Sequence, residues 1–104
     1  MKTIDDWIRL QEDREMFSIL AKRLSYYEGI GVLIEDGLID IGLVAKLSSG
    51  NIISFWERFG DGVKAIREYY NWPRWAIMVE YLYDQVIKYS EKHPELMITI
   101  PENR

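Results

Sequence analysis

The sequence predicts an all-α fold: an antiparallel helical bundle of three longer helices and one short connecting helix. Apolar residues recur along most of the chain at alternating steps of three and four, which is the spacing of one helix face. Residues 35–40, Glu-Asp-Gly-Leu-Ile-Asp, interrupt this spacing with a helix stop followed by a helix start. A chain of 104 residues forms one domain. We assign this domain to residues 1–93 and expect 94–104 to be a tail, partly extended or disordered.

The first expected helix covers residues 4–35. The polar stretch 11–15 predicts a bend or break, and the regular apolar stripe follows it: Phe17, Leu20, Leu24, Tyr27, Gly31 and Ile34. The opening residues Ile4, Trp7 and Ile8 form a stripe of their own, which we expect to project from the bundle. A projecting apolar stripe needs a partner, and a second copy of the chain is the simplest one. The sequence therefore favours a homodimer.

The joint at residues 35–40 separates the first helix from a short one. Gly37 suits a helix end, because the left-handed conformation costs glycine little. Asp40 suits the N-cap of a short helix over residues 41–47. Residues 48–51, Ser-Ser-Gly-Asn, then predict a turn.

Two further helices complete the predicted bundle, over residues 52–70 and 73–92. The first has the most regular stripe in the chain, and Gly60 and Gly62 near its middle predict a kink or a tight crossing. Asn71 can end this helix in the left-handed conformation. Pro73 suits the first position of the last helix, which Pro94 ends.

Composition excludes several classes of function. The net charge is −4 and the pI is about 5.0, which disfavours binding to nucleic acid or to anionic lipid. There is no cysteine, which excludes disulfides and thiolate chemistry and fits the cytoplasm. No apolar run is long enough for membrane insertion of this chain. The scarcity of glutamine, Gln11 and Gln85 alone, is a thermophile-like bias.

Residues for catalysis or metal binding are scarce. His93 is the only histidine, and its place before Pro94 suits a charge at a helix end. One histidine excludes a two-histidine metal site within one chain, although an oligomer brings copies together. The acidic clusters fall on polar faces or at helix ends, where solvated surface is the default. We therefore expect no enzyme activity, no metal and no cofactor.

Gly31 and Arg67 are the first two candidate site residues. A glycine on an apolar stripe usually marks a close crossing by another helix, although a ligand contacting the backbone is the alternative. Arg67 points to nearly the same side as Trp56, three turns earlier. A half-buried arginine needs a carboxylate or carbonyl partner. We favour an ion pair with one of three carboxylates, those of Glu28, Glu80 and Asp84, over a site for an anion or an acidic partner.

The four tryptophans are the remaining candidates. Trp72 and Trp75 stand on either side of Pro73-Arg74 at a turn. They serve either as a cap on the core and a shield for the loop, or as part of a partner site or a membrane-interface belt. Trp7 lies on the opening stripe, and Trp56 lies on the most regular one.

Residues 17–89 resemble a family of small helical proteins known as domain of unknown function 4760. The resemblance rests on the segment Tyr27 to Asp40, on Trp56-Glu57 and on Arg67. It implies an all-α fold, no established activity and no assigned catalytic residues. Some similar proteins carry membrane helices ahead of the domain, and we expect none in this chain.

Two functions remain open. In the first, the protein is a non-catalytic interaction or structural module whose helix faces near Trp7, Trp72 and Tyr83 bind protein. In the second, the bundle binds a small apolar ligand, or performs unrecognised chemistry, in an aromatic pocket near Trp56, Phe59 and Arg67. A filled core with an exposed apolar patch favours the first, and an enclosed cavity with converging polar groups favours the second.

Overall fold

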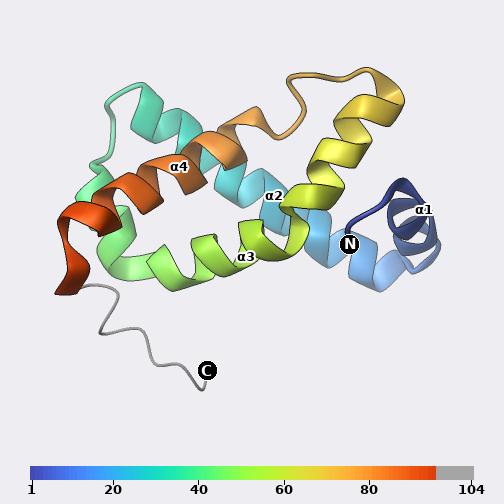
Figure 1. The fold of residues 1–104 in the computed structure, drawn as a ribbon, viewed down its shortest axis with the longest axis horizontal. Coiled ribbons are helices and arrows are strands. Elements are labelled where there is room, and N and C mark those ends of the chain that lie inside the picture. Colours follow the sequence, from blue (N-terminus) through green and yellow to red (C-terminus); the bar gives the residue numbers. More distant parts are fainter. Residues whose placement is uncertain (96–104) are drawn as a thin grey trace.

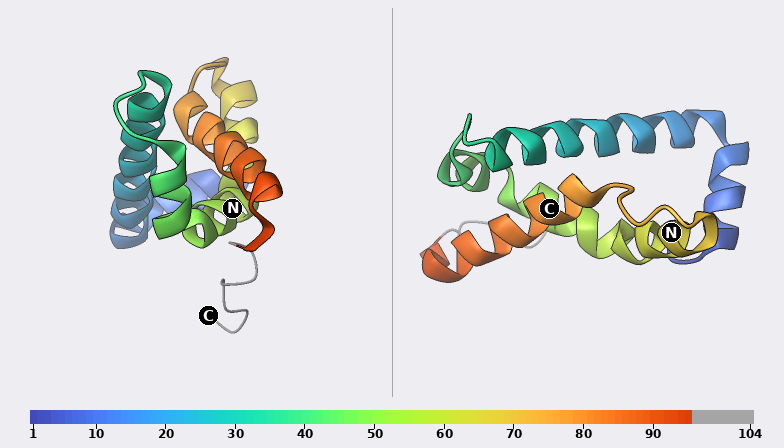
Figure 2. Two further views of the ribbon diagram at one scale, coloured as in Figure 1. Left: turned by 90° about the vertical axis from the view of Figure 1, so that its left-hand side faces the viewer. Right: turned by 90° about the horizontal axis from the view of Figure 1, so that it is seen from above.

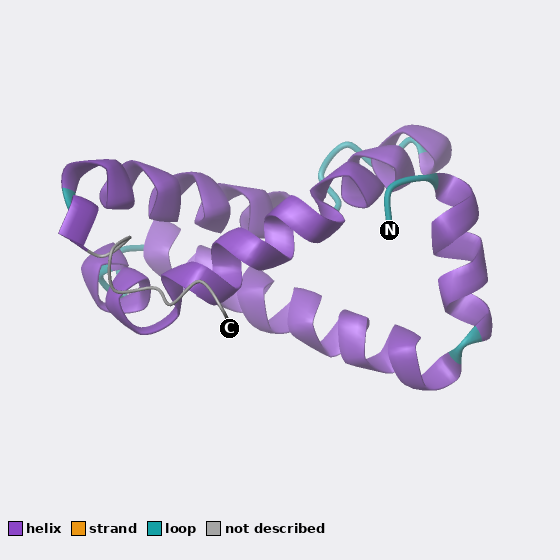
Figure 3. Cartoon of the chain, turned by 60° about the horizontal axis from the view of Figure 1, so that its bottom comes forward, coloured by secondary structure: helices purple, strands orange, loops and turns teal. Residues whose placement is uncertain are grey.

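The computed structural model describes residues 1–95, which form four helices (Figure 1). These are α1 (Ile4–Glu12), α2 (Arg14–Glu35), α3 (Ile41–Tyr70) and α4 (Ile77–Lys92). Figure 3 shows helices joined by short loops, and no strand occurs in this part of the chain. The predicted all-α bundle is confirmed. The predicted tail lies, from residue 96 on, outside the described residues.

The helices pack as a flat bundle of 40 × 34 × 21 Å. α3 runs back against the direction of α2, and α4 then returns along α2 (Figure 1). α4 packs on both α2 and α3, while α1 lies across the end of the bundle at which α2 begins (Figure 2). None of the four helices is long and apolar enough to cross a membrane.

α1 and α2 meet at Asp13, inside the polar stretch where a break was predicted. Asp13 is extended, and its side chain accepts a hydrogen bond from the Met16 amide at the start of α2. α1 has a capping box in which the Thr3 hydroxyl and the Asp6 carboxylate each accept from the backbone of the other residue. Both ends of the break are therefore stabilised by local hydrogen bonds.

The predicted projection of the opening stripe is wrong. The break at Asp13 turns α1 back onto α2 and α3, so that Trp7 is buried and Ile4 is partly buried. Only Ile8 of this stripe is exposed, at 42%. The bundle itself therefore buries most of this stripe, and no second copy is needed to cover α1.

The joint between α2 and α3 is built as predicted. Gly37 has φ of +77°, its amide donates to Ile34 O at 3.0 Å, and the Leu38 amide donates to Leu33 O at 2.8 Å. These two bonds form a Schellman motif. Asp40 is the N-cap residue of α3, although its side chain makes no capping hydrogen bond.

The predicted short helix over 41–47 and the turn over 48–51 are wrong, because α3 is one helix of 30 residues. Ser49 is buried in phase with Ala45 and Ile52 on the core face. Burial of this continuous stripe outweighs the poor helix propensity of Ser-Ser-Gly-Asn. Figure 1 shows the α3 ribbon changing direction in its green part and again before its yellow end. Kinks at glycine and serine are common.

The predicted start of the last helix at Pro73 is also wrong. Asn71 ends α3 in the left-handed conformation, as predicted, with φ of +57°. The chain then forms turns over residues 72–76, and α4 begins at Ile77. Ala76 also adopts a left-handed conformation, with φ of +56°, which breaks the helix that Pro73 would otherwise start.

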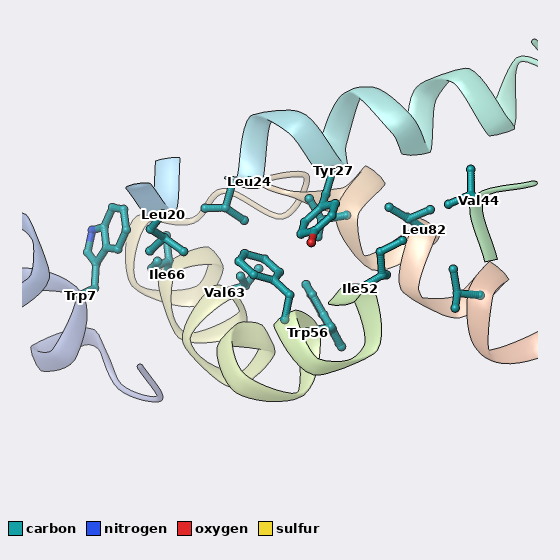
Figure 4. Packing of buried hydrophobic residues seen from close by; sticks show 13 residues of the cluster. Trp7, Leu20, Leu24, Tyr27, Val44, Ile52, Trp56, Val63, Ile66 and Leu82 are labelled. Atoms are coloured by element: carbon teal, nitrogen blue, oxygen red, sulfur yellow. The ribbon is translucent and has the colours of Figure 1, made fainter. Parts of the chain in front are cut away.

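The core forms a row along the molecule (Figure 4). Trp7 lies at the α1 end of this row and Val44 lies at the other, with Trp56 and Tyr27 between them (Figure 4). The side chains of Ile52, Val63, Ile66 and Leu82 are at most 2% exposed. Each helix contributes to this one cluster, which is the behaviour of a single domain.

Candidate functional site

Arg67 joins α3 to the loop and to the first turn of α4. Its Nε donates to Trp75 O at 2.7 Å, and its Nη1 donates to Glu80 Oε1 at 2.7 Å. The two side chains are 14% and 28% exposed, so the ion pair is partly shielded from water. Glu80 is one of the three partners predicted for Arg67. The remaining nitrogen, Nη2, is buried with no hydrogen-bond partner among residues 1–95.

Glu28 links α2 to the first turn of α4 by a hydrogen bond. Its Oε1 accepts from the Val79 amide at 3.0 Å, across 51 residues of sequence. Val79 is in the first turn of α4, where backbone amides have no partner within the helix. The N-cap residue, Ala76, has no side chain able to accept such a bond, so a carboxylate from α2 does so instead. Arg67 therefore holds the loop at residues 72–76 on α3, and Glu28 holds the first turn of α4, directly after this loop, on α2.

A cleft of about 520 Å³ lies between this loop and α2. Trp7 of α1 also lines it, next to the loop residues Arg74, Trp75 and Ala76. The opposite wall comes from one side of α2: Phe17, Leu20, Ala21, Leu24, Ser25 and Glu28. Residues of α1, of α2 and of the distant loop before α4 thus converge on one mainly apolar cleft, which is open to solvent rather than enclosed.

Aromatic rings build one end of the cleft. The Trp7 ring lies 5.8 Å from that of Trp75 in an edge-to-face arrangement and 5.4 Å from that of Phe17. Edge-to-face pairs are favourable beyond the area they bury. Trp7 is 7% exposed and therefore serves as a fixed base, while Trp75 and Phe17 are only partly buried. A second molecule would meet preformed aromatic surface here.

Two features give the cleft a polar and strained edge. The Glu28 carboxylate and the exposed Arg74 guanidinium both line it, so opposite charges flank an apolar surface. Ala76, on the loop wall, holds a left-handed backbone that costs an alanine about 1–2 kcal/mol. Strain of this kind persists only where surrounding contacts impose it, and it clusters at binding sites. Glu28 and Arg67 supply those contacts.

The other candidate residues lie apart from the cleft. Gly31 packs against the backbone of Met78 on α4, so the small-residue crossing is observed there. Trp56 is buried beside Tyr83, with ring centroids 6.0 Å apart, and its ring also covers Gly60. Trp72 is 48% exposed and stacks on Tyr70 at 4.5 Å. Of the six candidates, the structure brings Trp7, Trp75 and Arg67 to one region.

Sequence reasoning missed the roles of Glu28 and Ala76. The sequence predicts Glu28 only as a partner for Arg67, because it predicts a start of α4 four residues before the observed one. With α4 starting after an alanine, the absence of a local cap is a signal that a distant acceptor is needed. Nothing in the sequence indicates a positive φ at Ala76.

Groups with displaced pKa values lie outside the cleft. Burial raises the pKa of the Tyr27 and Tyr83 phenols above the usual range. Hydrogen bonds from the Lys2 backbone, the Arg9 side chain and the Thr3 backbone hold the pKa of Asp6 well below its usual range. None of these three residues lines the cleft. Within residues 1–95, no group of three or more His, Asp or Glu side chains is placed to hold a metal ion.

Comparison with known proteins identifies a family and nothing finer. A family model described as "Domain of unknown function (DUF4760)" matches residues 4–86, which include all of α1, α2 and α3 and most of α4. No curated protein and no solved structure matches the chain significantly.

Proposed function

The chain belongs to the DUF4760 family, and we propose that it is a non-catalytic interaction module whose cleft receives an apolar side chain of a partner protein. The open cleft beside Trp7 and Trp75 carries this proposal. Its preformed aromatic end resembles the pockets in which interface anchors are buried, since aromatic residues dominate binding hot spots. The acidic, cysteine-free composition supports a location in the cytoplasm as part of the same proposal.

The charges at the cleft indicate the chemistry of the partner segment. Glu28 and Arg74 present a carboxylate and a guanidinium at the edge of the apolar surface. A segment with an aromatic or aliphatic anchor and a flanking charge would satisfy both features. The separation of the cleft from Asp6, Tyr27 and Tyr83 supports binding over catalysis, because catalytic sites gather groups with displaced pKa values.

Selection from a random peptide display library tests this proposal. We expect enriched peptides with an apolar anchor, and binding at least tenfold weaker to Ser25→Arg than to the parent protein. Ser25 is exposed and lines the cleft, so the long arginine side chain fills the site without disturbing the core. Ser54→Arg, at an exposed serine of α3 outside the cleft, is the matched control. Peptides that bind both variants equally would contradict the proposal.

A small apolar ligand is the second candidate, and the size of the cleft favours it. Small-molecule sites commonly measure about 300–1,000 Å³, which includes this cleft of about 520 Å³. Trp75 lines this cleft and Trp56 is buried in the core, which supports a ligand beside Trp75 rather than beside Trp56. The dye anilinonaphthalene sulfonate is a suitable probe. One dye bound per chain in the parent and none in Ser25→Arg, without any cleft-dependent peptide, would favour the small ligand over the module.

A further inference from the structure

α2 carries a second apolar stripe that its own chain leaves largely open, although Ile30 within it packs partly against the core. The residues Met16, Ile19, Arg23, Tyr26, Ile30 and Leu33 follow the same three-four spacing as the buried stripe, one residue earlier. They therefore lie on one line, about 100° around the helix from the core face. Met16 is 51% exposed, Ile19 49% and Tyr26 64%, so this face of α2 is open to solvent.

The exposed stripe continues onto α3. A groove of about 430 Å³ lies between the two helices, with Asn51 of α3 on one side and five residues of α2 on the other: Ile19, Lys22, Arg23, Tyr26 and Tyr27. Leu47 lies one turn before Asn51 on α3 and is 74% exposed. The open surface thus includes residues of two helices, and contiguous exposed apolar surface is typical of interaction sites.

The order of residues along the stripe is self-complementary. Reversal about a point between residues 24 and 25 brings Met16 opposite Leu33, Ile19 opposite Ile30, and Arg23 opposite Tyr26. A two-fold dimer requires this property, because the same surface is used by both copies in opposite directions. An apolar residue then meets an apolar residue at both ends of the interface.

The residues at the centre of the stripe determine the register in which two copies pair. Arg23 makes no ion pair among the described residues, and it lies on the stripe where every other side chain is apolar or aromatic. In the reversed pairing each Arg23 guanidinium stands over the Tyr26 ring of the other copy, a favourable cation–π contact made twice. A register shifted by one turn places arginine against an aliphatic side chain instead. Only the central register gives the Arg23 side chain of each copy an aromatic ring to contact.

We propose that the protein forms a two-fold homodimer through antiparallel contact of the exposed α2 stripes, with Arg23 of each copy on Tyr26 of the other. This surface lies on a different side of α2 from the cleft, so it does not depend on the proposed partner site. The homodimer expected from the sequence would thus form through α2 rather than through α1.

The mass in solution and three tyrosine variants test the interface. Sedimentation equilibrium should give twice the chain mass of 12.4 kDa at high micromolar concentration. Tyr26→Lys places a positive charge against Arg23 of the other copy. The dissociation constant of the dimer should therefore be at least tenfold higher than that of the parent protein. Tyr26→Trp keeps an aromatic ring and should keep the dimer. Tyr69→Lys, at a tyrosine of α3 that is 61% exposed, is the matched control and should also keep it.

Cross-linking tests the register, because the chain has no cysteine of its own. Ile19→Cys mixed with Ile30→Cys should form a disulfide-linked dimer. Either variant alone should not, since its two cysteines would lie about 16 Å apart along the paired helices, too far for a disulfide.

Four outcomes would overturn the proposal. A monomeric parent at these concentrations would show that no second copy covers the stripe. A dimer unaffected by Tyr26→Lys would have a different interface, and cross-linking by single variants as well as by the mixture would contradict the register. A monomer that binds a displayed peptide through Tyr26 would assign the stripe to another partner.

Discussion

α2 has two apolar stripes with the same spacing, one mostly buried and the other mostly exposed. The stripe from Phe17 to Ile34 packs on α1, α3 and α4, while the stripe from Met16 to Leu33 faces solvent except at Ile30, which is partly buried. Periodicity does not separate them, since both repeat every three and four residues. The difference lies at two positions. The buried stripe has Gly31, where α4 crosses, and the exposed stripe has Arg23, which no described residue pairs with. A small residue marks the face that packs within the chain, and a charged residue on an apolar stripe marks the face that remains open to solvent.

Truncation of neighbouring residues on the two stripes is expected to give the largest contrast. Leu20 is 6% exposed, so Leu20→Ala leaves a cavity in the core and should lower the free energy of unfolding by about 2–5 kcal/mol. Ile19 is 49% exposed, and Ile19→Ala should change it by less than about 0.5 kcal/mol. Urea unfolding at dilute protein concentration measures both. Similar losses in the two variants would contradict the assignment of the faces.

The two glycines of α2 give a contrast of opposite sign. A methyl group at Gly31 would collide with the backbone of Met78, which cannot move aside as a side chain does. Gly31→Ala should therefore destabilise by about 1–3 kcal/mol. Nothing lies within 4 Å of a methyl group at Gly29, so Gly29→Ala should stabilise by about 0.5–1 kcal/mol through helix propensity. Thermal unfolding of both variants is the measurement. A Gly31→Ala variant more stable than the parent would contradict the close packing of α4 on Gly31.

The sequence was informative where one local reason sufficed. Gly37 and Asn71 end their helices as predicted, because a left-handed residue is favoured at such positions by its own chemistry. Gly31 on the apolar stripe predicts a helix crossing, because the absence of a side chain allows another helix to approach closely. Each of these predictions needs only one residue and the helix that contains it.

The errors arose where tertiary contacts outweigh local preference. Ser49 is in the middle of α3, because burial between Ala45 and Ile52 outweighs its turn propensity. The polar break at Asp13 indicates that α1 ends but gives no direction for its return. The cleft needs the relative placement of three segments, which no local pattern contains. The candidate tryptophans were identified, but which of them share a site depends on the start of α4.

A polar contact at the edge of the buried stripe is expected to have a smaller effect. Glu28→Ala removes the acceptor for the Val79 amide and should cost about 1 kcal/mol, as loss of a helix cap does. Glu28→Gln keeps a carbonyl oxygen at the same position and should retain most of that stability. Hydrogen exchange at the Val79 amide reports the contact directly. Equal exchange rates in the parent and in Glu28→Ala would show that the carboxylate does not cap α4.

The smallest expected effect separates two adjacent tyrosines, one on each stripe. Burial raises the pKa of the Tyr27 phenol above its usual value of about 10, so the folded protein keeps a proton that the unfolded chain releases. The free energy of unfolding should therefore be unaffected by this group below about pH 10 and should fall as the pH rises further. Tyr27→Phe removes this contribution and should make the alkaline fall less steep. Tyr26→Phe, on the exposed stripe, is the control, and urea midpoints between about pH 8 and pH 11 measure all three proteins. An equal change of slope in both variants would mean that burial of Tyr27 does not control its ionisation, and the contrast between the two faces would lose its electrostatic part.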